Sequence, residues 1–99
     1  MNAQIARYGK GYEVVFQSWV VYHDPNPDGQ GVCRLLATLP EADLARLARA
    51  RVRLSRAWHA PVWSNGVRVR HDEADRNRYA RLRETLNQRA LRLLWKRHG

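Results

Sequence analysis

The sequence contains one cysteine, two lysines and no long hydrophobic run. A single thiol, Cys33, excludes an internal disulfide, and we expect a small buried hydrophobic residue there rather than a nucleophile. No stretch reaches the about 18 uncharged apolar residues that a membrane-spanning helix needs, and no basic start leads into an apolar run. We therefore expect a cytoplasmic protein that neither crosses a membrane nor carries a secretory signal.

Residue patterns typical of metal and catalytic sites are also missing. The histidines, His23, His59, His71 and His98, lack the paired spacing of a zinc site. The loop at 24–29 resembles the start of a calcium-binding loop, but prolines occupy both intervening positions and the closing acidic residue is absent. Helix capping explains most acidic residues, and no serine lies in a nucleophile motif. We predict no metal site, no cofactor and no enzymatic activity.

Arginine is abundant, and it is unevenly placed. The formal net charge is +9 over 99 residues. Residues 1–40 have balanced charge, so residues 41–99 carry the whole excess. All but two of the basic residues are arginines, whose planar guanidinium suits forked contacts with phosphate. A GC-rich genome would also favour arginine over lysine, but it would not concentrate the net charge in one half.

A hairpin pattern at 62–71 organises the basic half. Asn65-Gly66 between apolar residues is typical of a two-residue turn, because both turn positions need a positive φ. Such a turn should fold the helical segments on either side back towards each other.

Two amphipathic helices are predicted to flank this hairpin. Thr38-Leu39-Pro40-Glu41 has the form of a capping box, which predicts a helix from Thr38 to about His59. Asp72 can cap a second, final helix. Arg51 points into the apolar face of the first helix, where it either reaches the rim or pairs with a carboxylate such as Glu84.

Helical periodicity divides each of these helices into two faces. The predicted buried face of the first helix consists of Leu44, Leu47, Ala48, Leu54 and Trp58, with arginines opposite. The predicted buried stripe of the final helix consists of Tyr79, Leu82, Leu86, Ala90 and Leu93, with basic residues beside it.

The neutral half is predicted to be rich in β-structure. Residues 1–11 have little pattern, whereas 12–22 are rich in β-branched and aromatic residues and indicate a strand or a bent pair of strands. Two prolines and two glycines at 23–31 predict a loop, and the apolar run at 32–37 a returning strand. Phe16, Trp19 and Tyr22 would form a base-stacking platform if exposed, but the neutral charge of this half favours a core role.

The resulting fold prediction is a small single α+β domain over residues 1–99. Its order is an N-terminal β-hairpin, a helix, a short β-hairpin and a long C-terminal helix (β-β-α-β-β-α). It consists of a neutral β-rich part, 1–40, and a basic helix-hairpin-helix part, 41–99.

The leading functional hypothesis is non-catalytic binding of DNA or RNA phosphates through an arginine-rich surface. Fixed positive charge gains affinity by releasing counterions and needs no sequence-specific motif. The predicted nucleic-acid-binding residues are Arg46, Arg49, Arg53, Arg56, Arg68, Arg70, Arg78, Arg81, Arg89, Arg92 and Lys96.

Resemblances to two families add alternatives. The pairs Arg53/His59 and Arg92/His98 have a spacing similar to the active motif of helical HEPN-type ribonucleases, which would imply cleavage of RNA. The helix-hairpin-helix at about 42–90 resembles the small head-to-tail joining proteins of tailed phages, which implies an interaction protein.

The second hypothesis is therefore a phage or mobile-element protein that docks on an acidic protein surface, as a virion component or an inhibitor of a host machine. Its buried anchors would be Trp58, Trp63, Leu94 and Trp95. Formation of a homo-oligomer is left open.

Overall fold

The structure is a computed structural model, and it describes most of the chain. The described backbone comprises residues 1–59, 63–64, 67–68 and 73–98, and the described side chains are those of residues 1–54, 77 and 80–98. Within these residues the protein is mixed α+β, with three α-helices and a three-stranded antiparallel sheet. The predicted fold class is confirmed, but the predicted order of elements is not.

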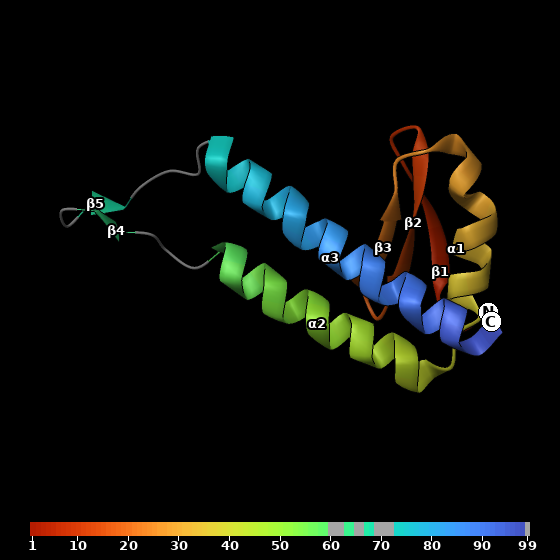
Figure 1. Ribbon diagram of the computed structural model, residues 1–99. Coiled ribbons are helices and arrows are strands. Elements are labelled where there is room, and N and C mark those ends of the chain that lie inside the picture. Colours follow the sequence, from red (N-terminus) through yellow and green to blue (C-terminus); the bar gives the residue numbers. More distant parts are fainter. Residues whose placement is uncertain (60–62, 65–66, 69–72, 99) are drawn as a thin grey trace.

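The sheet is built from the first 24 residues and has the order β1-β2-β3 (Figure 1). Its strands are β1 (Gln4–Tyr8), β2 (Gly11–Phe16) and β3 (Trp19–Asp24). The bent pair expected over 12–22 is therefore confirmed as β2 and β3. Residues 1–11 have little sequence pattern, yet β1 lies there and pairs with β2 along its whole length.

The turn between β2 and β3 has an unusual backbone. Gln17 and Ser18 have φ values of 50° and 68°, in the left-handed region that glycine and asparagine normally supply. Phe16 pairs with Trp19 across this turn. Two positive φ values in a row are typical of a type I′ hairpin turn, whose twist matches that of the strands. Because Gln-Ser is not the usual sequence for such a turn, the sequence pattern did not predict it.

The segment 32–37 is helical, so the prediction of a returning strand is wrong. A short 3₁₀ helix, η1 (Pro27–Gly29), leads into α1 (Gln30–Ala37). Cys33, Leu36 and Ala37 are buried, and Leu35 is 47% exposed. This burial follows the helical spacing i, i+3, i+4, which a short apolar run does not distinguish from a buried strand.

The helix α2 (Glu41–His59) ends where predicted but begins three residues later. The Thr38 hydroxyl donates to the Leu35 carbonyl, at 2.7 Å, and so closes α1 instead of opening α2. The amides of Asp43 and Leu44 donate to the Pro40 carbonyl. The predicted capping box is therefore wrong, because the two helices are separated by only three residues and Thr38 belongs to the first.

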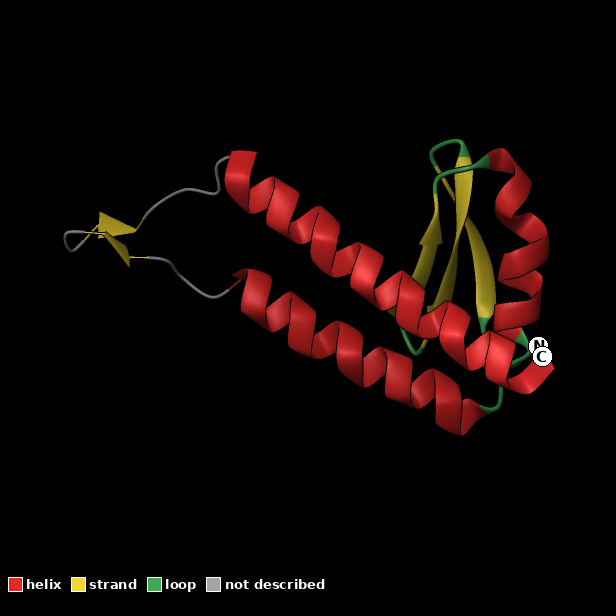
Figure 2. Ribbon diagram, viewed as in Figure 1, coloured by secondary structure: helices red, strands yellow, loops and turns green. Residues whose placement is uncertain are grey.

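The predicted hairpin between the two long helices is confirmed as the pair β4 (Trp63–Ser64) and β5 (Val67–Arg68), in which Ser64 pairs with Val67. The predicted turn residues Asn65 and Gly66 and the predicted cap Asp72 lie outside the described residues. The final helix, α3 (Glu73–His98), runs antiparallel to α2 and contacts it, as the hairpin pattern predicted (Figure 2).

The core lies where the sheet meets the three helices. Val14, Leu36, Leu44 and Leu47 are fully buried there. The predicted faces are confirmed for Leu44, Leu47, Ala48, Leu86 and Ala90, and Leu54, Leu82 and Leu93 are partly buried. Burial of such side chains contributes roughly 1.5–3 kcal/mol each.

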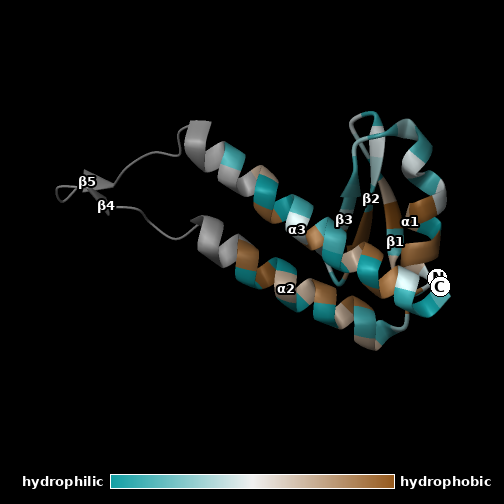
Figure 3. Ribbon diagram, in the orientation of Figure 1, coloured by the Kyte–Doolittle hydropathy of each residue, from teal (hydrophilic) through white to brown (hydrophobic). Residues whose placement is uncertain are grey.

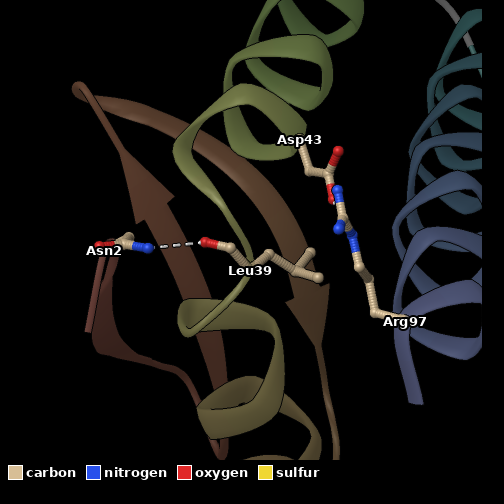
Figure 4. A network of polar contacts seen from close by, with 4 residues as sticks. All are labelled: Asn2, Leu39, Asp43 and Arg97. Atoms are coloured by element: carbon tan, nitrogen blue, oxygen red, sulfur yellow. Dashed lines mark hydrogen bonds and ion pairs between the residues drawn. The ribbon is translucent and has the colours of Figure 1, made fainter.

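Two polar contacts hold the α1–α2 loop and the first turn of α2 (Figure 4). The Asn2 side-chain amide donates to the Leu39 carbonyl at 2.9 Å. Arg97 near the end of α3 donates through Nε to the nearly buried Asp43 carboxylate in the first turn of α2, also at 2.9 Å. The second contact joins α3 to α2 at this end of the antiparallel helix pair.

A side chain of α3 covers the edge of the sheet. Asn87 accepts a hydrogen bond from the His23 amide at 3.0 Å and donates one to the His23 carbonyl at 2.7 Å. The carboxamide thereby mimics the next strand beside β3, and it satisfies backbone groups that an edge strand would leave unpaired.

Candidate nucleic-acid interface

The exposed side of α2 carries three arginines. Arg46, Arg49 and Arg53 are exposed, while Leu44 and Leu47 on the opposite side are buried. Figure 3 shows the resulting alternation of hydrophilic and hydrophobic residues along the described part of α2. The spacings of three and four residues place the arginines on one helical face, as predicted.

A groove between α2 and α3 brings these arginines together with a cation from the far end of the sequence. Arg46, Arg49 and Arg53 line it from α2 and Arg89 lines it from α3, over a cavity volume of about 330 Å³. Ala50 and Leu93 also line this groove, and the small Ala50 side chain leaves room between the helices. We call the four arginines with Ala50 and Leu93 the arginine groove.

The groove continues along the helix pair into a smaller hollow of about 130 Å³. Ala50, Arg53 and Arg89 line both cavities, and the hollow adds Leu54, Thr85 and Leu86. The two cavities together form a furrow between α2 and α3 that is lined by Arg46, Arg49, Arg53 and Arg89.

The charge of the arginine groove is not neutralised by the described part of the protein. None of its four arginines forms an ion pair within the described residues, and no described lining residue of either cavity is acidic. Arg97, by contrast, is paired with Asp43. Guanidinium groups stay charged at all physiological pH values, so the groove holds four fixed positive charges.

Clustering these cations has a cost to the fold. Like charges three or four residues apart on a helix destabilise it by a few tenths of a kcal/mol per pair, roughly. A bound anion would remove that repulsion and satisfy up to five N–H donors on each guanidinium.

The other predicted phosphate-binding residues extend the groove only in part. Arg81, Arg92 and Lys96 are exposed on α3 but do not line the arginine groove. By helical spacing they lie on the side of α3 that continues from Arg89 towards solvent. The side chains of Arg56, Arg68, Arg70 and Arg78 lie outside the described residues.

The predicted protein-docking anchors differ in how far their side chains are exposed. Leu94 is 2% exposed and belongs to the core, so its prediction as a surface anchor is wrong. The helix α3 contacts β3, α1 and α2, and three partners bury a wider face than the predicted stripe. Trp95 is 65% exposed, as an anchor requires. The side chains of Trp58 and Trp63 lie outside the described residues.

Another cavity lies on the other flank of the α2 arginines. It has a volume of about 330 Å³ and is lined by Gln17 of the β2–β3 turn and Trp19 at the start of β3, together with residues of α2. Those residues of α2 are Ala45, Ala48, Arg49, Val52 and Arg53. We call it the Trp19 hollow. Sequence reasoning missed it, because Trp19 and the arginines beside it are about thirty residues apart in the chain.

A separate cavity, of about 140 Å³, lies around the buried His23. Burial lowers the pKa of His23, and the nearby Arg83 guanidinium lowers it further, which keeps the imidazole neutral at pH 7. Tyr8 packs edge-on against the His23 ring, with ring centroids 4.4 Å apart. Arg51 also lines this cavity, with Glu13 and Asn87.

The cysteine and the histidines show no catalytic arrangement in the described residues. Cys33 is fully buried, as predicted, and burial raises the pKa of its thiol to about 11. No group of three or more His, Cys, Asp or Glu residues suited to a metal ion occurs among the residues described. Arg92 and His98 are exposed on α3, and the side chain of His59 lies outside the described part.

None of the helices in the described ranges is both long and apolar enough to cross a membrane. No protein-family model, curated protein or solved structure matches this chain.

Proposed function

We propose that this protein binds nucleic acid without catalysis, through contacts between the arginine groove and backbone phosphates. The observation that carries the proposal is the convergence of Arg46, Arg49, Arg53 and Arg89 on one groove with no acidic residue among its described lining. A surface that only kept the protein in solution would gain from interspersed carboxylates, which reduce repulsion.

Phosphate is the chemistry that this groove fits best. Guanidinium groups bind phosphate oxygens in a forked geometry, and each contact releases condensed counterions from the nucleic acid. The apolar Ala50 and Leu93 between the cations offer no hydrogen-bonding pattern that would read a base edge. Binding in the groove is therefore independent of base sequence.

The remaining basic residues would add to the same interaction. Arg81, Arg92 and Lys96 are exposed next to Arg89 on α3 and extend the positive surface. The other predicted phosphate-binding residues are Arg56, Arg68, Arg70 and Arg78. In this proposal the protein requires no cofactor. It would meet nucleic acid in the cytoplasm.

The test compares two variants, each of which loses three positive charges, one variant in the arginine groove and the other elsewhere on the protein. In the groove variant, Arg46, Arg49 and Arg53 are changed to Gln; in the control variant, Arg7, Lys10 and Arg34 are changed to Gln. Both variants have the same net charge, and the control residues are all exposed. Binding of a labelled oligonucleotide is measured by fluorescence anisotropy over a salt series.

We expect the groove variant to lose affinity on the order of 100-fold at about 50 mM salt, and its salt slope to fall by about 2 to 3. The control variant should lose much less. Equal losses in both variants would mean that net charge alone is responsible, and undetectable binding by the unchanged protein at this salt concentration would refute the proposal.

A second candidate function is docking on an acidic protein surface, as a phage or mobile-element interaction protein. The observation in its favour is Trp95, which is 65% exposed in the basic last turns of α3. Large exposed aromatic residues beside arginines are typical of binding hot spots. Purification with nuclease treatment distinguishes the two candidates, because a stoichiometric protein partner survives the treatment and carried nucleic acid does not.

A further inference from the structure

The Trp19 hollow adds an aromatic surface to the proposed phosphate site. Trp19 is the first residue of β3 and is 38% exposed, whereas Phe16 and Tyr22 of the same sheet are buried. Of the three aromatic residues at 12–22 that would suit a stacking platform, Trp19 alone is exposed. Its neighbours across the hollow are residues of α2.

Two arginines connect the hollow with the arginine groove. Arg49 and Arg53 line both cavities, so they form the ridge that separates them. A phosphate bound by these guanidiniums has Arg89 on one side and Trp19 on the other. The base attached to the same nucleotide is thereby brought to the entrance of the Trp19 hollow.

The hollow has the size and lining that a single base needs. Its volume of about 330 Å³ is at the lower end of the range for small-ligand clefts, about 300–1,000 Å³. Ala45, Ala48 and Val52 form an apolar wall with the indole, and Gln17 supplies a carboxamide that can donate and accept hydrogen bonds. Arginine next to a stacked base adds a cation–π contribution.

From this geometry we infer that the protein selects single-stranded over double-stranded nucleic acid, by stacking an unpaired base on Trp19 while Arg49 and Arg53 hold its phosphate. The inference rests on the proposed function. In a duplex, each base is paired and stacked inside the helix and reaches an external indole only after it is flipped out. A single strand offers its bases without that cost.

The experiment compares three ligands of equal length and charge per strand. They are a labelled single strand of about 12 nucleotides, the same strand with abasic sites in place of bases, and a duplex. Each is titrated against the unchanged protein and against Trp19→Ala, Trp19→Phe and Trp95→Ala. Trp95→Ala is the matched control, because Trp95 is exposed but does not line the hollow.

We expect Trp19→Ala to weaken binding of the single strand about 10-fold and to leave the abasic strand and the duplex unchanged. Trp19→Phe should recover most of the affinity, because it keeps an aromatic face, and Trp95→Ala should have no effect. Equal weakening of all three ligands, or of none, would overturn the inference.

A fluorescence measurement removes any dependence on the folding of Trp19 variants. In a chain with Trp58, Trp63 and Trp95 changed to Phe, Trp19 emission should be quenched by the single strand and not by the abasic strand. Quenching by neither, with salt-dependent binding of both, would refute base stacking and leave the proposed function intact. Absence of binding to all three ligands would refute both.

Discussion

The neutral residues 1–40 and the basic residues 41–98 contribute different things to this protein. The first region supplies the sheet, α1 and much of the described core, including Val14, Val21 and Leu36. The second adds one buried face from each of α2 and α3, and among its described arginines it exposes Arg46, Arg49, Arg53, Arg81, Arg89 and Arg92. The two regions meet along α2, whose buried side packs against the sheet of the first region while its opposite side carries exposed arginines.

The comparison also shows that the separation is incomplete at the proposed site. The arginines of the groove come entirely from the second region, but Trp19 and Gln17 of the Trp19 hollow come from the first. Charge points to the proposed phosphate site, whereas the aromatic surface of the Trp19 hollow lies in a region with no net charge. The three tests below probe this division, from the largest expected effect to the smallest.

Removal of a core side chain from the scaffold region should have the largest effect on stability. Leu36→Ala deletes a side chain that is 1% exposed, and we expect a loss of about 2–5 kcal/mol in the free energy of unfolding. Leu35→Ala in the same helix is the control, because Leu35 is 47% exposed and should change stability by about 0.5 kcal/mol or less. Urea unfolding followed by circular dichroism measures both, and similar losses would contradict the placement of α1.

Loss of the bridge between the two regions should have an intermediate effect. Asn87→Ala removes both hydrogen bonds to His23 and leaves buried backbone groups of β3 without partners, which should cost about 1–3 kcal/mol. Gln88→Ala removes a bond between exposed side chains and should be nearly neutral. Amide hydrogen exchange at His23 should accelerate in the first variant only; unchanged exchange there would show that Asn87 does not cover the strand edge.

The smallest of the three effects is a pH dependence that arises at His23. Its pKa is lowered in the folded protein, mainly by burial and then by Arg83, so the unfolded chain binds a proton more readily. Stability is therefore complete well above pH 6.5 and falls as the pH drops through about 6.5, by at most about 1.4 kcal/mol per pH unit.

The measurement compares unfolding curves between pH 5 and 8, a range of about 1.5 pH units on either side of the ordinary histidine pKa. His23→Gln should flatten the dependence, and His98→Gln, at an exposed position, should not. If His23→Gln and the unchanged protein lose stability in parallel on acidification, the neutral buried imidazole is not the cause.

Local patterns predicted the two long helices and the Asn-Gly hairpin well, but they failed at the β2–β3 turn, at α1 and at the start of α2. The end of α2, the β4–β5 hairpin and the antiparallel helix pair follow from periodicity and from Asn65-Gly66. The turn at Gln17-Ser18 lacks the usual residues, and α1 is too short for its periodicity to distinguish helix from strand. Thr38 fitted the sequence pattern of a capping box, but its hydroxyl donates to the Leu35 carbonyl at the C-terminal end of α1 instead.

The sequence by itself determined the net charge, its concentration in residues 41–99 and the arginine face of α2, because these depend only on composition and on spacing within one helix. The tertiary structure decided which side chains meet. Arg89 joins Arg46, Arg49 and Arg53 only because α3 packs antiparallel to α2, and Trp19 reaches Arg49 only because a turn of the sheet lies against α2. Contacts between distant segments depend on how the buried faces fit together, and no local pattern encodes that fit.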